Sequence, residues 1–107
     1  MFEYDLIDIK ENTKFLDEKE HNGFASHDTW DLDLHLMADN ELLQKNTLEA
    51  VSNGLDSFII FAMDFIYEYN LYYMVEYNEI YFEYLKIDFV GLYNHYLEYY
   101  KDSLSDL

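Results

Sequence analysis

Hydrophobic residues recur at steps of three and four along most of this chain, which is the spacing of one face of an α-helix. Three stretches show it, and they predict helices over about 27–45, 47–70 and 75–101. Proline is absent and glycine occurs only three times, so little in the chain interrupts long helices. The pattern predicts an all-α fold, a compact bundle of three main helices in a single domain over residues 1–107.

Each predicted helix has an apolar stripe on which it can pack. The stripe of the first consists of Trp30, Leu34, Met37 and Ala38, with Leu32, Leu36 and Leu43 beside it. The stripe of the second consists of Val51, Leu55, Ile59, Met63 and Ile66, widened by Phe58 and Phe65. The stripe of the third consists of Phe82, Leu85, Phe89, Leu92, Tyr96 and Tyr99. Gly54 falls inside the second helix, where we expect a close helix–helix approach.

Residues 1–20 show no clear period. Their first apolar side chains are Phe2, Tyr4, Leu6 and Ile7. These fit either a short strand or a helical turn, and we expect a short irregular or β-like segment. A loop follows at 21–23, where Gly23 can adopt a positive φ. Ser26 is then placed to cap the first helix, with Asp28 in its first turn, where the helix dipole favours a carboxylate.

The charge balance restricts the partners of this chain. It carries 23 Asp and Glu residues against six Lys and no Arg, a net charge of −17. Such a surface repels nucleic acid and anionic membrane and attracts basic proteins. The absence of Arg also removes the side chain best suited to bidentate phosphate binding. We therefore expect no direct binding to nucleic acid or membrane, and instead a protein that imitates nucleic acid.

Other features of the composition favour a folded protein inside a cell. Half of the residues are hydrophobic and a fifth are aromatic, enough to form a core despite the charge. Cysteine is absent, which excludes disulfides and thiolate chemistry. The longest apolar stretch, residues 58–67, is too short to span a bilayer. The first ten residues are acidic, so we expect no signal peptide.

The C-terminal half combines acids with tyrosines, and eleven of the 12 tyrosines follow residue 66. If the third stripe faces inward, Glu76, Glu79 and Glu83 share an exposed helical ridge about 10 Å long. A line of carboxylates can imitate the charge of a nucleic-acid backbone, and exposed tyrosines suit protein interfaces. The alternative is a solvated helix face with the tyrosines in the core. The predicted partner-binding residues are Glu68, Tyr69, Glu76, Tyr77, Glu79, Glu83 and Tyr84.

A metal site is a weaker possibility. His27, Asp31 and His35 are spaced four residues apart, on one face of the first helix, and imidazole and carboxylate both bind zinc. The outer two lie about 12 Å apart, so a closed site needs His21 or His95 as well. The alternative is a solvated polar face with one His–Asp pair. We expect no cofactor.

Nothing in the sequence indicates an enzyme. It has no nucleophile elbow, no glycine-rich phosphate loop and no catalytic triad. Asp64, within the apolar second helix, is the best candidate for a carboxyl group with a raised pKa. A hydrogen bond from a tyrosine hydroxyl to Asp64 is the more ordinary interpretation.

Residues 23–33, which read GFASHDTWDLD, resemble a family of small bacteriophage proteins without an assigned activity. The recurring pattern is a glycine, an aromatic residue and a serine, followed by D-x-W-x-L-D at the start of a helix. The resemblance implies a phage or prophage origin and activity in the host bacterial cytoplasm. The same residues have structural interpretations, in which Trp30 anchors the first turn in the core and Asp33 accepts a hydrogen bond from a neighbouring helix.

These observations predict a phage-encoded, non-enzymatic inhibitor of a basic host protein that handles nucleic acid, such as a restriction, CRISPR or repair enzyme. Binding would use charge mimicry and would weaken with salt. A structural or assembly subunit that forms a homo-oligomer, such as a homodimer, is the first alternative. A metal-binding protein that uses His27, Asp31 and His35 is the second.

Overall fold

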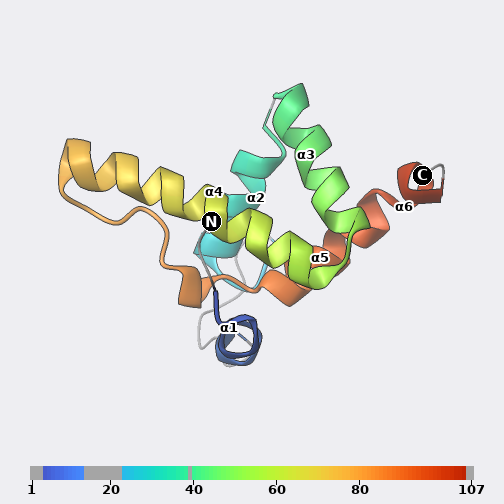
Figure 1. Ribbon diagram of the computed structural model, residues 1–107, viewed down its shortest axis with the longest axis horizontal. Helices are drawn as coiled ribbons and strands as arrows, with labels where there is room; N and C mark the ends of the chain where they lie inside the picture. The colour runs from blue at the N-terminus through green and yellow to red at the C-terminus, as the bar shows by residue number, and fades with distance from the viewer. Residues whose placement is uncertain (1–3, 14–22, 39, 106–107) are drawn as a thin grey trace.

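The computed structural model describes residues 4–13, 23–38 and 40–105, and these form α-helices and one 3-10 turn around a common core (Figure 1). The elements are α1 (Leu6–Thr13), α2 (His27–Leu36), α3 (Glu41–Ser52), α4 (Leu55–Tyr77), η1 (Tyr84–Lys86), α5 (Phe89–Tyr99) and α6 (Lys101–Ser105). The all-α class predicted from the sequence is confirmed.

Helix α4 is the longest element and organises the others. Its 23 residues correspond to about 34 Å, in a molecule that measures 43 × 29 × 28 Å. Helices α3 and α5 contact α4, and α2 contacts both α3 and α5. In Figure 1 the C-terminal half of α4 extends to the left beyond the other helices, and the chain then returns beneath it toward η1 and α5. This projecting half positions the candidate site.

The breaks between helices differ from those predicted. The first predicted helix is interrupted after Leu36, and Asn40 begins α3 by accepting a hydrogen bond from the Leu43 N–H at 3.1 Å. Gly54 separates α3 from α4 with a φ of +105°, a conformation that favours glycine. No atom lies within 4 Å of the position of a Cβ at Gly54. The predicted close helix–helix approach there is therefore wrong.

The third predicted helix, from about residue 75 to 101, is also divided. Helix α4 continues to Tyr77 and ends at Asn78, which adopts the left-handed conformation at φ 55°. An irregular segment and η1 follow, and Asp88 caps α5 by accepting from the Gly91 N–H at 2.9 Å. At the other end of the chain, Leu6–Thr13 is helical, so the helical alternative is confirmed for these residues and the irregular or β-like one is wrong. Residues 1–3 and 14–22 lie outside the described part.

The core confirms most of the predicted packing residues. It contains Leu32, Leu36, Val51, Phe58, Ile59, Met63, Ile66, Phe82, Phe89, Leu92 and Tyr96. Helix α2, however, buries Thr29, Leu32 and Leu36, whereas Leu34 is exposed and Trp30 is half-buried. The predicted stripe of that helix is therefore wrong by part of a turn, and Trp30 is not a core anchor. Leu85 and Tyr99, assigned to the third stripe, are also exposed.

Two predicted roles in the 23–33 motif are confirmed. Ser26 caps α2 by accepting from the Thr29 N–H at 3.1 Å, and Asp33 accepts from the Tyr96 hydroxyl of α5 at 2.7 Å. The structure adds a third role, because the same motif holds residues 83–88. The Ser26 hydroxyl donates to the Lys86 carbonyl, and the Thr29 hydroxyl oxygen accepts from the Asp88 N–H at 2.9 Å.

Candidate protein-binding surface on helix α4

The candidate site is the projecting part of α4 together with the segment that folds back along it, residues 65–83, which we call the α4 arm (Figure 1). Asn70 connects its two halves. Its side-chain oxygen accepts from the N–H groups of Tyr81 at 3.1 Å and Phe82 at 2.7 Å, and its side-chain nitrogen donates to the Phe82 carbonyl at 2.9 Å. One side chain on α4 thus fixes the position of the returning segment.

A row of aromatic rings runs along one face of the arm. Phe65, Tyr69, Tyr73 and Tyr77 follow at four-residue intervals, which places them on the same side of the helix. Successive ring centroids are 5.7, 5.2 and 5.2 Å apart, with interplanar angles of 32°, 19° and 34°. Successive rings of the row therefore lie over one another along the helix, tilted by 19–34° from one to the next.

Tyr81 and His35 pack against this row. The Tyr81 ring lies 5.0 Å from that of Tyr69 and 4.6 Å from that of Tyr73. The His35 ring lies 4.8 Å from that of Tyr69, edge to face. Burial, followed by the hydrogen bond to Asp31 and the charge of that carboxylate, raises the pKa of Tyr81 to about 12. The Tyr81 hydroxyl therefore remains a protonated donor at neutral pH.

Both ring nitrogens of His35 are engaged within the protein. Nδ1 lies 2.8 Å from the Asp31 carbonyl oxygen, and Nε2 lies 2.9 Å from the Tyr69 hydroxyl. A carbonyl oxygen only accepts, so the neutral ring carries its proton on Nδ1 and accepts from Tyr69 at Nε2. The alternative in which His35 is a metal ligand conflicts with these two contacts.

Of the other proposed metal ligands, Asp31 lies beside His35, with Oδ1 3.6 Å from Nδ1, whereas His27 and His95 make other contacts. His27 is exposed, and its ring packs beside that of Trp30 at 5.5 Å. His95 instead lies edge to face with Phe24 at 5.3 Å. Within the described ranges, no group of three or more His, Cys, Asp and Glu residues is arranged to hold a metal ion. His21 lies outside the described residues.

Asp64 has a structural partner. Its Oδ1 accepts from the Tyr4 hydroxyl at 2.6 Å, which ties the chain before α1 to the middle of α4. The predicted hydrogen bond between Asp64 and a tyrosine is confirmed.

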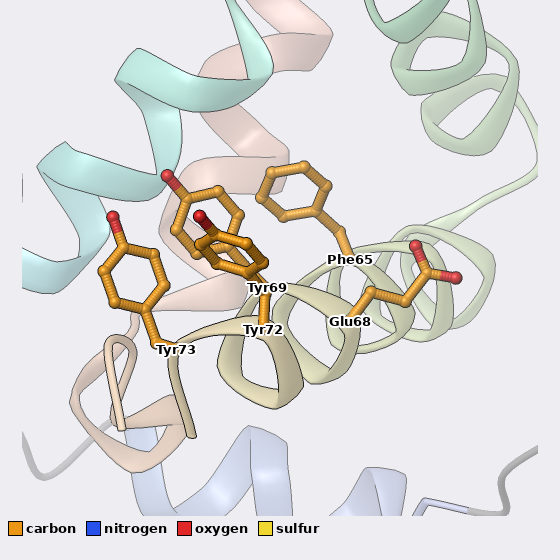
Figure 2. Close-up of a pocket in the computed structure, with 5 residues that line it drawn as sticks. All are labelled: Phe65, Glu68, Tyr69, Tyr72 and Tyr73. Atoms are coloured by element: carbon orange, nitrogen blue, oxygen red, sulfur yellow. The ribbon is translucent and has the colours of Figure 1, made fainter. Parts of the chain in front are cut away.

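An open groove lies along the row of rings. It has a volume of about 460 Å³ and is lined by Phe65, Glu68, Tyr69, Tyr72 and Tyr73. Figure 2 shows the three tyrosine rings grouped together, with Glu68 extending away from them on the side of Phe65. The Tyr72 side chain is 55% exposed, and its ring meets that of Tyr73 edge to face at 5.4 Å. Aromatic rings thus line a recess that the acidic Glu68 side chain borders on the side of Phe65.

The acids of the arm do not form the ridge predicted from the sequence. Glu76 lies in the last turn of α4, but Glu79 follows the left-handed turn and Glu83 lies on the returning segment. The Glu83 carboxylate pairs with Lys86 at 3.3 Å, and its N–H donates to Asp28 at 3.0 Å. All three remain exposed. The prediction of a single helical ridge is wrong because α4 ends at Tyr77.

The predicted partner-binding residues differ in exposure. Glu68, Glu76, Tyr77, Glu79, Glu83 and Tyr84 are exposed, whereas Tyr69 is half-buried against His35. Exposed residues that the sequence reasoning did not select are Leu71, Tyr72, Met74, Val75 and Ile80. A helical wheel drawn through Tyr77 would have found Leu71, Met74 and Val75, because they lie on the side of α4 away from the Tyr69 row, whereas Tyr72 borders that row.

Comparisons with protein-family models, with curated proteins and with solved structures found no match to this chain. The resemblance of residues 23–33 to a phage family stays a prediction from the sequence. Among the described helices, none is long and apolar enough to cross a membrane.

Proposed function

We propose that this chain is a non-enzymatic inhibitor that binds a basic, nucleic-acid-handling protein through the α4 arm. The observation that carries the proposal is the combination of projection, exposed aromatic surface and uniform negative charge on one element. No Lys, Arg or His occurs between Lys45 and Lys86, a span that includes the whole arm. The arm can therefore approach a basic surface without like-charge repulsion.

The exposed apolar side chains of the arm supply contact area. Val75 is 74% exposed, Tyr77 is 61% exposed and Ile80 is 59% exposed. Interfaces concentrate binding energy in a few large side chains, with tyrosine among the most frequent, and surround them with polar groups. The arm has this composition, with Glu68, Glu76 and Glu79 around its tyrosines.

The acids of the arm carry negative charge, as a nucleic-acid backbone does, but their charges are more widely spaced. Glu68 and Glu76 lie about 12 Å apart along the helix axis, whereas one DNA strand carries a phosphate about every 3.4 Å. We therefore assign steering to the carboxylates and most of the contact energy to the aromatic side chains. A net charge of −17 raises the association rate with a basic partner and makes that rate fall with salt.

The phage origin implied by residues 23–33 makes a bacterial lysate the appropriate source of the partner. The test is capture by tagged protein at low salt, followed by elution with double-stranded DNA. The proposal predicts that DNA releases one basic nucleic-acid-binding protein, whose activity the chain then inhibits in a purified assay. Captured proteins that DNA does not displace, or a displaced protein that is not inhibited, would contradict the proposal.

Self-association is a second candidate function, and the apolar side chains exposed on α4 favour it. Leu71, Met74 and Val75 lie on one exposed side of the helix, and a second copy could cover them. The charge of each copy opposes this pairing. Light scattering at several concentrations and at high salt decides between the two, since a monomeric mass throughout would exclude the oligomer.

A further inference from the structure

The groove beside the aromatic row combines two chemical features that bind organic cations. Phe65, Tyr69, Tyr72 and Tyr73, all on α4, line it with rings, and Glu68 on the same helix borders it with an acidic side chain. Ring faces attract cations through their quadrupole, and a carboxylate adds a direct ion pair. The volume of about 460 Å³ lies within the range of sites that hold small molecules, roughly 300–1,000 Å³.

The carboxylate in this groove has no cation of its own. Glu68 forms no ion pair or hydrogen bond with any residue in the described part of the chain. The described lysines that pair do so elsewhere, as Lys86 does with Glu83 and Lys101 with Glu98. No described lysine pairs with Glu68, so the groove is open to a positive charge supplied by another molecule.

We propose that this groove binds an arginine side chain of the partner protein. This inference rests on the proposed function, because it names the group through which a basic partner is held. A guanidinium group is planar, stacks on aromatic rings, is weakly hydrated and forms paired hydrogen bonds with a carboxylate. A lysine ammonium group is compact and strongly hydrated, so it fits a ring-lined recess less well.

The geometry gives each side chain a role. The Tyr69 and Tyr73 rings stack at 19°, and Phe65 packs on Tyr69 with a tilt of 32°. Tyr69 and Tyr73 are further fixed by packing against Tyr81. They form a preorganised wall that loses little freedom on binding. Tyr72 is the exposed ring that borders the opening, and Glu68 orients the guanidinium group.

The experiment is an NMR titration of the full chain at low salt. The probe is N-acetyl-L-arginine methylamide, compared with the corresponding lysine compound and with the citrulline compound, which keeps the shape of arginine without its charge. The proposal predicts saturable shifts of the ring-proton signals of Phe65, Tyr69, Tyr72 and Tyr73 with the arginine probe. It also predicts at least threefold weaker binding of the lysine probe and no saturable shift with the citrulline probe.

Two exposed positions allow variants that keep the fold. Glu68→Gln and Tyr72→Leu should each weaken binding of the arginine probe about twofold to fivefold, the range of one exposed ion pair or one exposed cation–π contact. Glu49→Gln is the matched control, because Glu49 lines a different open groove that contains one phenyl ring, Phe61. The control should bind the probe as the parent does, and far-UV circular dichroism should be unchanged in all three variants.

Equal shifts with the arginine and citrulline probes would overturn the proposal, and so would equal affinity for arginine and lysine. The same holds if Glu49→Gln weakens binding as much as Glu68→Gln. This titration is independent of the partner. A probe that fails to bind while DNA still displaces a captured and inhibited protein refutes only the groove assignment. A probe that binds while no basic protein is captured refutes the proposed function and leaves the groove as a guanidinium site.

Discussion

Tyr96 provides the sharpest test of how the helices are held together. It is fully buried in α5, where its ring lies 5.7 Å from that of Phe58. Its hydroxyl donates to Asp33 of α2 at 2.7 Å. Substitution of Tyr96 by Phe keeps the ring in the core and removes only this hydrogen bond. The measured change in stability therefore reports the bond between α2 and α5.

The expected loss follows from the type of bond. A hydrogen bond to a charged group contributes about 1.5–3 kcal/mol, and its loss leaves the carboxylate at Asp33 without its buried donor. A chain of this length has an unfolding entropy near 0.22 kcal/mol per kelvin, estimated at about 2.1 cal/mol/K per residue. The melting temperature of Tyr96→Phe should therefore fall by about 7–13 °C. A loss of about 1.5–3 kcal/mol is a large part of a typical total stability of about 5–15 kcal/mol.

The assay is urea unfolding followed by circular dichroism, supported by calorimetry. Tyr99→Phe is the matched control, since Tyr99 lies on the same helix but is 63% exposed, and its stability should change by less than about 0.5 kcal/mol. A double-mutant cycle with Asp33→Ala isolates the pair, because non-additivity measures direct coupling. If Tyr96→Phe costs no more than Tyr99→Phe, or if the cycle is additive, the assigned bond does not stabilise the fold.

Three further predictions concern the arm, the helix cap and alkaline pH. Asn70→Ala removes three hydrogen bonds and should accelerate hydrogen exchange at the amides of Tyr81 and Phe82 at least tenfold. Unchanged protection of these amides would show that Asn70 does not fix the returning segment. Ser26→Ala removes the α2 cap and should lower the unfolding free energy by about 1–2 kcal/mol in urea titrations, with Ser103→Ala, exposed on α6, as the neutral control. Burial, followed by the hydrogen bond to Asp33, raises the pKa of Tyr96 in the folded state above the ordinary value of 10.0. Above pH 10 the unfolded chain therefore loses protons that the folded chain keeps, so the unfolding free energy should fall as pH rises from 10 toward 12. The fall should be less steep in Tyr96→Phe. An unfolding free energy that does not change between pH 10 and 12 would contradict the prediction.

The sequence predicted the helical class, a helix cap and a buried helix face because these features depend on residues close together in the sequence. A serine before a polar, acidic turn predicted the α2 cap, and the spacing of Val51, Ile59, Met63 and Ile66 predicted a buried face. The hydrogen bond to Asp33 was also predicted, although its donor, Tyr96, was not. In contrast, the anchoring of residues 83–88 by the 23–33 motif needs contacts between residues far apart in the sequence, which no local pattern encodes.

The predicted helix boundaries were wrong for an identifiable reason. The three- and four-residue spacing of apolar side chains continues through the breaks, since loop residues also face the core. Phe82 and Ile87 are buried although neither lies in an α-helix. The breaks themselves are set by single residues, a side-chain cap at Asn40 and a left-handed turn at Asn78. Periodicity alone does not detect such residues.

The candidate site was placed in the C-terminal half from the distribution of acids and tyrosines, but its geometry depends on these boundaries. Extension of a helix through Glu76, Glu79 and Glu83 predicted a ridge, whereas the turn at Asn78 separates them. The half-buried position of Tyr69 depends on its bond to His35, which lies on a different helix.

The central claim is that the acids of the α4 arm, and not the net charge alone, select a basic partner. The most direct measurement compares two triple variants in the capture and DNA-elution experiment. Glu68, Glu76 and Glu79 are changed to Lys in one, and the exposed Glu11, Glu49 and Asp102 are changed to Lys in the other. Both variants undergo the same change in net charge. The account predicts that only the arm variant loses the DNA-displaceable protein at unchanged helicity, and equal retention or equal loss in the two variants would contradict it.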